Sequence, residues 1–430
     1  MKSLSHASQI EMLRNLWKYK ADEKEEELND FLRIVNRSVQ AENFTGCPLY
    51  ITMIATVYER DIVTYLNADD WLWPEIDGVH LYEVFVEKKL HIYLTEKQKA
   101  DITNPSVLDE YEYSTQKYLE DFEKCALVGI LSSCMLESLH NKKVEEEIQP
   151  FLGKVQAGKD KTGILLNVVE GKPQFVNRTF AEFFTARWFS RNFQFNRSVL
   201  EAIFFDRGYR FTRDMFDRML AKDSPLHRAV LEKNMMKFRR LVTEGYNVKA
   251  LDKGDRTVLH IDTDNLTRYF TVHYTSKDGG SLDNTDSVLQ WTPLQYAIKN
   301  SDWHTVESLL QSNVDRSGLD MIRQRAQDTE YINPIILHAA TWGQVLLLEF
   351  LCSMGVNVHQ ASSTDFPSPL HAAIYSEHLP IIRLLIQHGA DCGAETSDGQ
   401  TLLFYAVVTC SLEIVQALVE EEERHWTYVM

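Results

Sequence analysis

The sequence predicts a mainly α protein, in which a helical domain with one β-hairpin precedes a solenoid of repeated helix pairs. Three observations predict this fold class. A Leu-His and Ala pattern recurs at a step of about 33 residues in the second half of the chain. Apolar residues recur at helical spacing through much of the first half. A turn signal near residues 163–178 separates two short β-prone runs.

The composition bounds the domain count and the class of partner. With 430 residues, of which 44% are hydrophobic, the chain is long enough for two or more cores. Its formal net charge of −17 disfavours nucleic acid and anionic membrane surfaces, because phosphate groups need a positive footprint. The N-terminus lacks the apolar core of a signal peptide, and the longest apolar run, around Cys125 to Leu136, is too short to span a bilayer. We therefore expect a soluble, cytoplasmic protein.

The cysteine pattern also predicts a cytoplasmic protein. They are scattered without a C-x-x-C pair, so they match neither a disulfide framework nor a zinc site. We expect reduced and mostly buried thiols. The six cysteines are Cys47, Cys125, Cys134, Cys352, Cys392 and Cys410.

The repeats are found by aligning the chain with itself. Four copies carry Leu-His, and in the other two the Leu is followed by Gln or Phe. Most copies then have a small Ala. The third copy opens with Thr292-Pro293, where a hydroxyl caps the first helix and a proline fits its first turn. The copies are Pro225–Ala229, Val258–His260, Trp291–Ala297, Leu337–Ala340, Leu370–Ala373 and Leu403–Ala406.

The second helix of each copy carries a Leu-Leu or similar pair and ends at a glycine. Gly245, Gly355 and Gly389 are placed to give the left-handed stop of a helix. The third and fourth copies stand further apart than one period, so an insertion of about ten residues lies near Arg316 to Asn333. We expect a longer finger or an extended helix end there.

This pattern resembles the ankyrin repeat family, whose period is about 33 residues and whose signature is T-P-L-H-x-A. The resemblance covers residues 222 to about 422 and implies an ankyrin-repeat α-solenoid over residues 221–430. The second repeat is degenerate, because Ile261-Asp262-Thr263 stands where a small residue belongs and a polar stretch follows to Ser287. The predicted repeats span 222–254, 255–289, 290–333, 334–366, 367–399 and 400–424.

Four histidines occupy one repeat position: His227, His260, His338 and His371. A metal site is one interpretation. At this position the side chain normally bonds neighbouring backbone across the stack, so we predict a structural role and no metal.

The first half predicts two further units, a helical subdomain at residues 1–78 and a winged-helix-like domain at 79–220. Residues 8–40 have helical spacing, and Pro48 opens an apolar helix after Gly46-Cys47. A long helix is predicted over Tyr111 to Met135. The turn Glu170–Pro173 indicates a hairpin wing near 163–178, followed by an aromatic helix from Thr179. This unit lacks the basic face that a DNA-binding winged helix needs.

Residues 8 to 195 also resemble the part of a NACHT-type signalling NTPase that follows the nucleotide-binding core, as in NOD-like receptors and invertebrate NACHT-ankyrin proteins. Four segments carry the resemblance. In that family the proline packs against adenine and a winged-helix histidine approaches phosphate, which implies weak nucleotide contacts by Pro48 and by Asn177. Asn177 stands in place of the histidine, and an amide cannot become a cation. The segments are Gln9–Leu13, Gly46–Leu49, Leu81–Phe85 and Phe175–Phe184.

No catalytic motif is found. Gly153–Lys159 has the glycine spacing of a phosphate loop, but Asp160 replaces the hydroxyl residue and the flanking elements are in the wrong order. There is no G-x-S-x-G, no H-E-x-x-H and no cysteine with a plausible catalytic partner set. We therefore expect no enzyme activity, no catalytic residue and no cofactor.

Ankyrin stacks present their inner helices on a concave side. The residue after the His position gives Arg228, Tyr296 and Tyr405, and the next turn gives Trp342 and Tyr375. Aromatic and Arg side chains are typical of interface hot spots, so these five are the candidate partner-binding residues. The alternative is that the rings only cover neighbouring repeats.

These expectations combine into one leading function: a cytosolic, non-enzymatic scaffold or sensor that binds a protein partner through its concave ankyrin face. A second interpretation is a fragment of a nucleotide-regulated NACHT-type ATPase whose phosphate loop is encoded upstream of Met1. A DNA-binding regulator is a third, disfavoured by charge. The partner and the oligomeric state are left open by the sequence.

Overall fold

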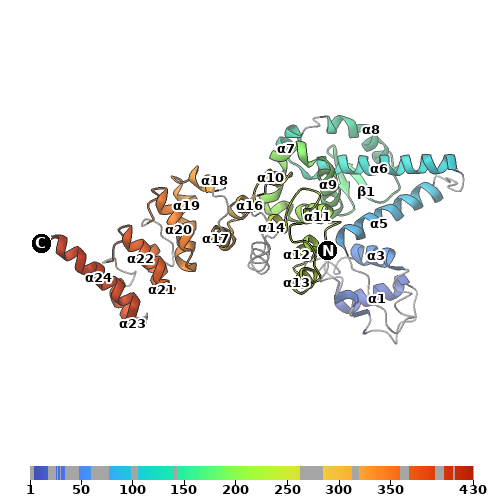
Figure 1. Cartoon of the computed structure of the whole chain (residues 1–430). Helices are drawn as coiled ribbons and strands as arrows, with labels where there is room; N and C mark the ends of the chain where they lie inside the picture. The colour runs from blue at the N-terminus through green and yellow to red at the C-terminus, as the bar shows by residue number, and fades with distance from the viewer. Residues whose placement is uncertain are drawn as a thin grey trace. The chain divides into compact units, whose positions relative to one another are not determined.

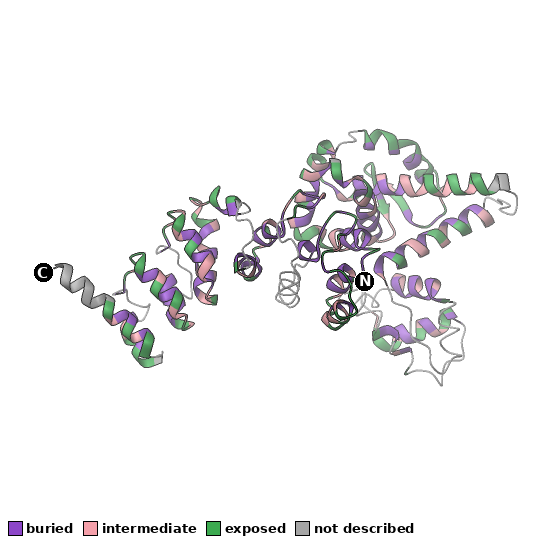
Figure 2. Ribbon diagram, viewed as in Figure 1, coloured by how far each residue is buried: buried purple, intermediate pink, exposed green. Residues whose placement is uncertain are grey.

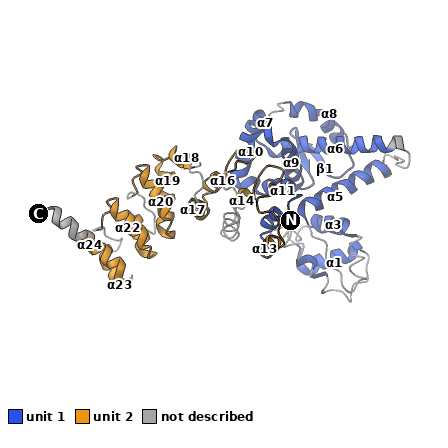
Figure 3. Cartoon of the chain, in the orientation of Figure 1, with its two compact units in different colours: residues 1–234 blue, residues 235–430 orange. Residues whose placement is uncertain are grey.

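The computed structural model in Figure 1 divides into two compact units, Met1–Asn234 and Met235–Met430, coloured separately in Figure 3. The predicted segments 1–78 and 79–220 both fall in the first unit, and the predicted first repeat, 222–254, spans the boundary between the units. The structure describes residues 4–17, 26, 28–29, 31–33, 48–59, 77–97, 105–139, 143–261, 284–311, 319–358, 368–392, 401–409 and 412–429.

The N-terminal unit is helical apart from one hairpin. Its helices before the hairpin are α1 (His6–Trp17), α3 (Pro48–Val57), α5 (Gly78–His91), the π-helical turn η2 (Ile92–Lys97), α6 (Pro105–Ile130), α7 (Ser133–Ser138) and α8 (Val144–Gln156). After the strands β1 (Leu165–Val169) and β2 (Lys172–Phe175) come α9 (Arg178–Asn192), η3 (Phe193–Phe195), α10 (Arg197–Phe205), η4 (Arg207–Tyr209), α11 (Arg210–Leu220) and α12 (Pro225–Leu231).

Helix α9 forms the centre of this unit. It packs against α6 and α11, and its phenylalanines Phe180, Phe183, Phe184 and Phe189 are all buried. The burial of apolar rings on every side of one helix explains why the sequence there shows no single polar face. The rings of α9 meet Phe122 of α6, whose ring centroid lies 5.3 Å from that of Phe184.

The long helix predicted over Tyr111 to Met135 is two helices in the structure. α6 ends at Ile130, and Ser132 then caps α7 by accepting a hydrogen bond from the N–H of Met135 at 3.4 Å. A serine cap competes with continued helix, which is the reason for the break. Because α7 buries none of its residues, Cys134 is exposed and is an exception to the expectation of mostly buried thiols.

The hairpin lies within the predicted segment. β1 and β2 pair antiparallel, with Val169 opposite Lys172. The two turn residues, Glu170 and Gly171, have φ of 49° and 76°. Two consecutive positive φ values are those of a type I′ turn, whose twist matches that of the strands.

The C-terminal unit is mainly helical in its described residues. Its helices are α13 (Met235–Thr243), α14 (Val258–Ile261), α16 (Pro293–Lys299), α17 (Trp303–Gln311), α18 (Asp320–Arg323), α19 (Thr329–Trp342), α20 (Val345–Ser353), α21 (Pro369–Tyr375), α22 (Leu379–Gln387), α23 (Leu402–Thr409) and α24 (Leu412–Val429).

These helices stack as pairs in two layers. The first helices of successive pairs pack on one another, α19 on α21 and α21 on α23, and the second helices α17, α20, α22 and α24 do the same. One apolar core runs through this unit from Leu259 to Leu418. Thr292 opens α16 with a capping box that includes Gln295, and Gly355 and Gly389 adopt the predicted positive φ, at 72° and 87°.

From residue 319 onward, the insertion near Arg316 to Asn333 includes an extended helix end, the second of its two expected forms. α18 and an extended α19 occupy its described part, and α19 has 14 residues where α16 and α21 have seven. Asp328 caps the longer helix by accepting from the N–H of Tyr331 at 3.2 Å. The degenerate second repeat keeps the four-residue helix α14, and its residues 262–283 lie outside the described part of the chain.

Candidate functional site

The histidines of the repeat position are held by hydroxyl groups three residues earlier. Ser224 Oγ lies 2.5 Å from Nδ1 of His227, and Ser368 Oγ lies 2.8 Å from Nδ1 of His371. Both histidines are buried. Each of these bonds joins the ring to the start of its own helix rather than to backbone across the stack.

His260 shows the complete arrangement. Its Nδ1 accepts hydrogen bonds from the N–H and the hydroxyl of Thr257, at 3.0 and 2.9 Å. Its Nε2 donates to the backbone carbonyls of Asn284 and Trp291, both at 3.1 Å. Burial lowers the pKa of His260, so the ring stays neutral. Over the described residues, no group of three or more metal-ligating side chains comes together.

His338 departs from this pattern, because Ile335 replaces the hydroxyl residue. Its ring lies instead beside His304 of α17, with ring centroids 5.4 Å apart. Burial and the neighbouring His304 lower the pKa of His338 to about 4. Gln344, also buried, places its Nε2 3.4 Å from Nδ1 of His304.

Trp342, Tyr375 and Val408 stand at one position in three successive repeats, each one repeat period from the next. Their exposed fractions are 57%, 64% and 66%. They project from α19, α21 and α23, which pack side by side, and the helices of this unit carry buried and exposed faces in Figure 2. We call these three residues the apolar row. Phe404 and Val407 of α23 are exposed next to it in the sequence.

The apolar row retains two of the five predicted partner-binding residues, Trp342 and Tyr375. The ring of Trp342 is supported from one side by His304, at a centroid distance of 5.2 Å and an interplanar angle of 74°. Sequence analysis missed Val408, although the repeat period leads to it directly from Trp342 through Tyr375.

The other three predicted residues do not join the row. Tyr296 is only 2% exposed, because its hydroxyl donates to the Asp286 carboxylate at 2.6 Å and its ring packs against Trp291. Its prediction as a surface residue is therefore wrong. Arg228 lies in the N-terminal unit, where its guanidinium is 3.9 Å from Glu232. Tyr405 lies in α23, but its side chain is outside the described part of the chain.

The two residues that the NACHT resemblance links to nucleotide lie at helix starts. Pro48 opens α3, and Asn177 caps α9 by accepting from the N–H of Thr179 at 3.0 Å. Tyr50 of α3 lies 2.8 Å from the Thr179 hydroxyl, so the two helix starts are close together. The side-chain oxygen of Asn177 is used by its own helix.

The sequence with phosphate-loop spacing does not form a loop at its first glycine. Gly153 and Lys154 lie within α8, which continues to Gln156. A phosphate loop needs a strand before it and a helix after it, whereas here a helix precedes strand β1. The match is therefore one of spacing alone.

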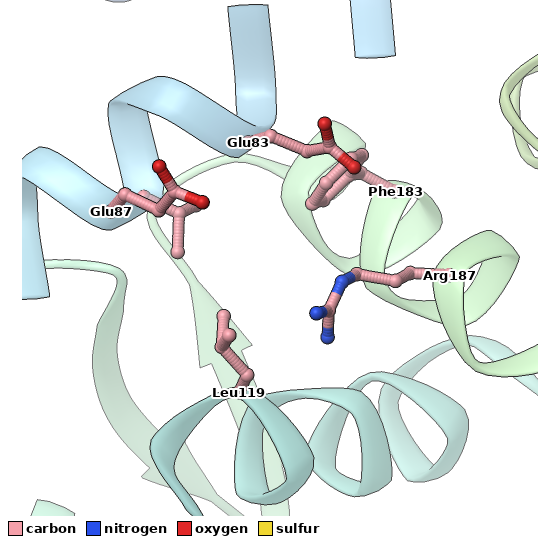
Figure 4. Close-up of a pocket in the computed structure, with 6 residues that line it drawn as sticks. Glu83, Glu87, Leu119, Phe183 and Arg187 are labelled. Atoms are coloured by element: carbon pink, nitrogen blue, oxygen red, sulfur yellow. The ribbon is translucent and has the colours of Figure 1, made fainter. Parts of the chain in front are cut away.

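Each unit has a concave site among its described residues. In the N-terminal unit, Glu83 and Glu87 of α5 face Phe183 and Arg187 of α9 across a cavity of about 40 Å³ (Figure 4), which has room for water rather than for a nucleotide. In the C-terminal unit, a groove of about 320 Å³ lies between α20 and α22, with Arg383 among its lining residues.

Comparisons with known proteins agree with the repeat pattern. The sequence model of the family described as ankyrin repeats (3 copies) matches residues 336–427. The B-cell lymphoma 3 protein homolog of Mus musculus is 27% identical over 187 residues, which cover 43% of this chain and 40% of that protein. The putative palmitoyltransferase ZDHHC13 of Danio rerio is 24% identical over 190 residues, which cover 38% of this chain and 29% of that protein.

The chain thus spans less than half the length of these relatives. Among solved structures, the ankyrin repeat domain of Bcl-3 is 20% identical, with 46% of this chain and 98% of that chain covered and a TM-score of 0.22. Within the described part of the chain, no helix combines the length and hydropathy of a membrane span. The fold is mainly α, and residues 336–427, which contain the whole apolar row, are ankyrin repeats.

Proposed function

We propose that this chain is a non-enzymatic, cytosolic scaffold or sensor that binds a protein partner through the apolar row. One observation carries the proposal: Trp342, Tyr375 and Val408 are all more than half exposed at the same position of three consecutive repeats. Contiguous exposed apolar surface on a folded protein is typical of an interaction site, and Trp and Tyr are enriched among hot-spot residues.

The alternative, that these rings only cover neighbouring repeats, accounts for part of Trp342. The rings of His304 and His338 pack against its indole, with centroid distances of 5.2 and 6.1 Å. More than half of the side chain stays exposed after these contacts, as does that of Tyr375. Packing between repeats would be served by smaller and more buried residues, such as the alanines Ala339 and Ala372 on the same helices.

An affinity experiment with matched variants tests the proposal. The tagged full chain, Trp342→Ala and Tyr375→Ala would each be used to capture proteins from a cell extract, with quantification by mass spectrometry. Tyr113→Ala is the control, because Tyr113 is 73% exposed on α6 in the other unit. We expect a set of proteins that the wild type and the control retain and both row variants lose. Equal capture by all four proteins contradicts the proposal.

The alternative function, a fragment of a nucleotide-regulated NACHT-type ATPase, has one supporting observation. The starts of α3 and α9, which carry Pro48 and Asn177, are brought together by the contact of Tyr50 with Thr179. Isothermal calorimetry with MgATP and MgADP separates the two functions. Micromolar binding that Pro48→Ala weakens supports the ATPase fragment, and no binding heat supports the interaction protein.

The palmitoyltransferase match does not favour a further function. It covers 29% of that protein. An activity does not transfer through a match of that extent.

A further inference from the structure

We propose that the apolar row binds an extended, Lys- or Arg-rich segment of the partner protein. The inference rests on the proposed function, because it names the chemistry of the partner that the same surface would take. It follows from three properties of the repeats: their charge, the aromatic faces of the row and the spacing of its residues.

The repeats that carry the row are almost without positive charge. Between Thr329 and Glu420 the sequence has a single Lys or Arg, which is Arg383. Surface potential of one sign attracts segments of the opposite sign and raises their association rate. The same segment has nine acidic residues: Glu330, Glu349, Asp365, Glu377, Asp391, Glu395, Asp398, Glu413 and Glu420.

Most of the described acidic side chains in these repeats are not neutralised within the chain. Glu330, Glu349, Glu377, Glu413 and Glu420 are exposed, and none takes part in an ion pair in the described structure. Glu377 lies in the turn after α21, two residues beyond Tyr375. A cation that contacts the ring of Tyr375 would therefore lie close to a carboxylate.

The two rings of the row suit a cationic side chain as well as an apolar one. An Arg or Lys over the face of Trp or Tyr is attracted by the ring quadrupole, and Trp is the best of the aromatic acceptors. The same unit already contains such a contact, because the Arg325 guanidinium lies 3.9 Å from the ring centroid of Tyr331. An Arg-rich segment would thus use both the charge and the rings.

The spacing of the row sets the form of the segment. α19, α21 and α23 are packed neighbours, and packed helix axes are about 8–10 Å apart. An extended chain advances about 3.3 Å per residue, so it passes from one row residue to the next in about three residues. A segment of about seven residues therefore reaches from Trp342 to Val408.

Peptide selection on the intact chain tests this inference. Random peptides displayed on phage, each longer than the segment that the row accommodates, would be selected on the immobilised full chain, and enriched peptides would be synthesised with a fluorophore for anisotropy titrations. We expect enriched peptides with a net positive charge and Arg beside apolar residues. Trp342→Ala and Tyr375→Ala should each weaken their binding by about tenfold or more. Glu377→Lys should weaken it about two- to fivefold.

The controls are Tyr113→Ala and Met236→Ala, which remove exposed apolar side chains elsewhere and should leave the affinity unchanged. Circular dichroism would verify that each variant is folded. Enriched peptides that are acidic or uncharged but still need Trp342 would overturn the basic-segment inference and leave the proposed function intact. Peptides whose binding no row variant changes, or a selection that enriches nothing, would contradict both.

Discussion

At the scale of single residues, the hydroxyl three positions before the repeat histidine decides what that histidine does. Where Ser368 or Thr257 supplies it, the ring is buried and bonded within its own repeat. Where Ile335 stands instead, the ring of His338 has no such hydroxyl partner. The Nε2 of His338, like that of His371, is buried and makes no hydrogen bond in the described structure. Burial and the neighbouring His304 lower the pKa of His338, and no hydrogen-bond acceptor at Nε2 stabilises the protonated ring.

The depressed pKa of His338 predicts that the repeats lose stability in acid. A base whose pKa falls from its ordinary value of about 6.5 to about 4 on folding stays neutral in the native state and is protonated more readily when unfolded. Its contribution is present above about pH 6.5 and is lost as the pH falls towards 4. The urea concentration at the unfolding midpoint should be lower at pH 4.5 than at pH 7.5. We expect this decrease to be smaller in His338→Gln than in the wild type, with unfolding followed by tryptophan fluorescence.

A second variant checks the cause of the shift. Burial lowers the pKa of His338 most, and His304, which faces it from α17, lowers it further. His304→Gln should therefore also reduce the pH dependence, but by less than His338→Gln, because the burial of His338 remains. The account would be contradicted if the urea midpoint of His338→Gln decreased between pH 7.5 and pH 4.5 by as much as that of the wild type.

Sequence periodicity predicted the exposed position of Trp342 and Tyr375 but not the burial of Tyr296. The difference is tertiary. Residues 284–291 fold back so that Asp286 accepts from the N–H of Trp291 at 2.9 Å and from the Tyr296 hydroxyl. The repeat pattern contains no information about this loop, because the loop belongs to the degenerate second repeat.

At the scale of elements, the helix ends are where the sequence was most informative. Glycines predicted to stop helices have positive φ, and the hairpin turn lies where Glu170-Gly171 predicted it. The division of Tyr111 to Met135 into α6 and α7 was missed, because a serine such as Ser132 also occurs inside helices and only its bond to the Met135 N–H marks it as a cap.

Two glycines at helix ends allow the backbone strain caused by an alanine substitution to be separated from the effect of a steric clash. Gly343 and Gly355 have φ of 70° and 72°, and an alanine at either position costs about 1–2 kcal/mol in backbone strain. A Cβ at Gly355 meets nothing within 4 Å, whereas one at Gly343 lies 2.8 Å from Nδ1 of His378. We expect Gly343→Ala to lower the free energy of urea unfolding by more than Gly355→Ala does.

The excess should come from His378. Its Nε2 lies 2.9 Å from the Thr341 carbonyl, so a ring that moves away from the new Cβ loses that bond. A lost hydrogen bond costs about 0.5–1.5 kcal/mol, which sets the expected difference between the two variants. The explanation fails if the two alanine variants are equally stable, or if His378→Ala does not remove the difference.

At the scale of the whole molecule, the chain contains two compact units, Met1–Asn234 and Met235–Met430. A hydrophobic core in the C-terminal unit is built from buried residues between Leu259 and Leu418. The core of the N-terminal unit is centred on α9, with Phe180 and Phe184 among its buried rings. The repeat period predicted the helices that form the C-terminal core. No sequence repeat marks the N-terminal core, so only the local pattern of each segment indicated its helices.

A cavity created in the core of one unit should therefore destabilise the helices that share that core. Leu351 of α20 is fully buried in the middle of the C-terminal core, and Leu351→Ala should destabilise the repeats by about 2–5 kcal/mol. Leu412, which is exposed at the start of α24, is the matched control, since its replacement by alanine should change stability by less than about 0.5 kcal/mol. Hydrogen exchange read by mass spectrometry gives the response of each helix.

We expect Leu351→Ala to raise exchange in α17, α20 and α22 together, because repeats that share one core unfold through their neighbours. Exchange in α6 and α9 should keep its wild-type rate, since no residue of those helices belongs to the same core cluster. Equal acceleration in α9 and α22 would show that the two interiors unfold as one. Acceleration confined to α20 would show that the repeats open singly, and a partner segment lying across α19, α21 and α23 would then stabilise three elements that otherwise unfold independently.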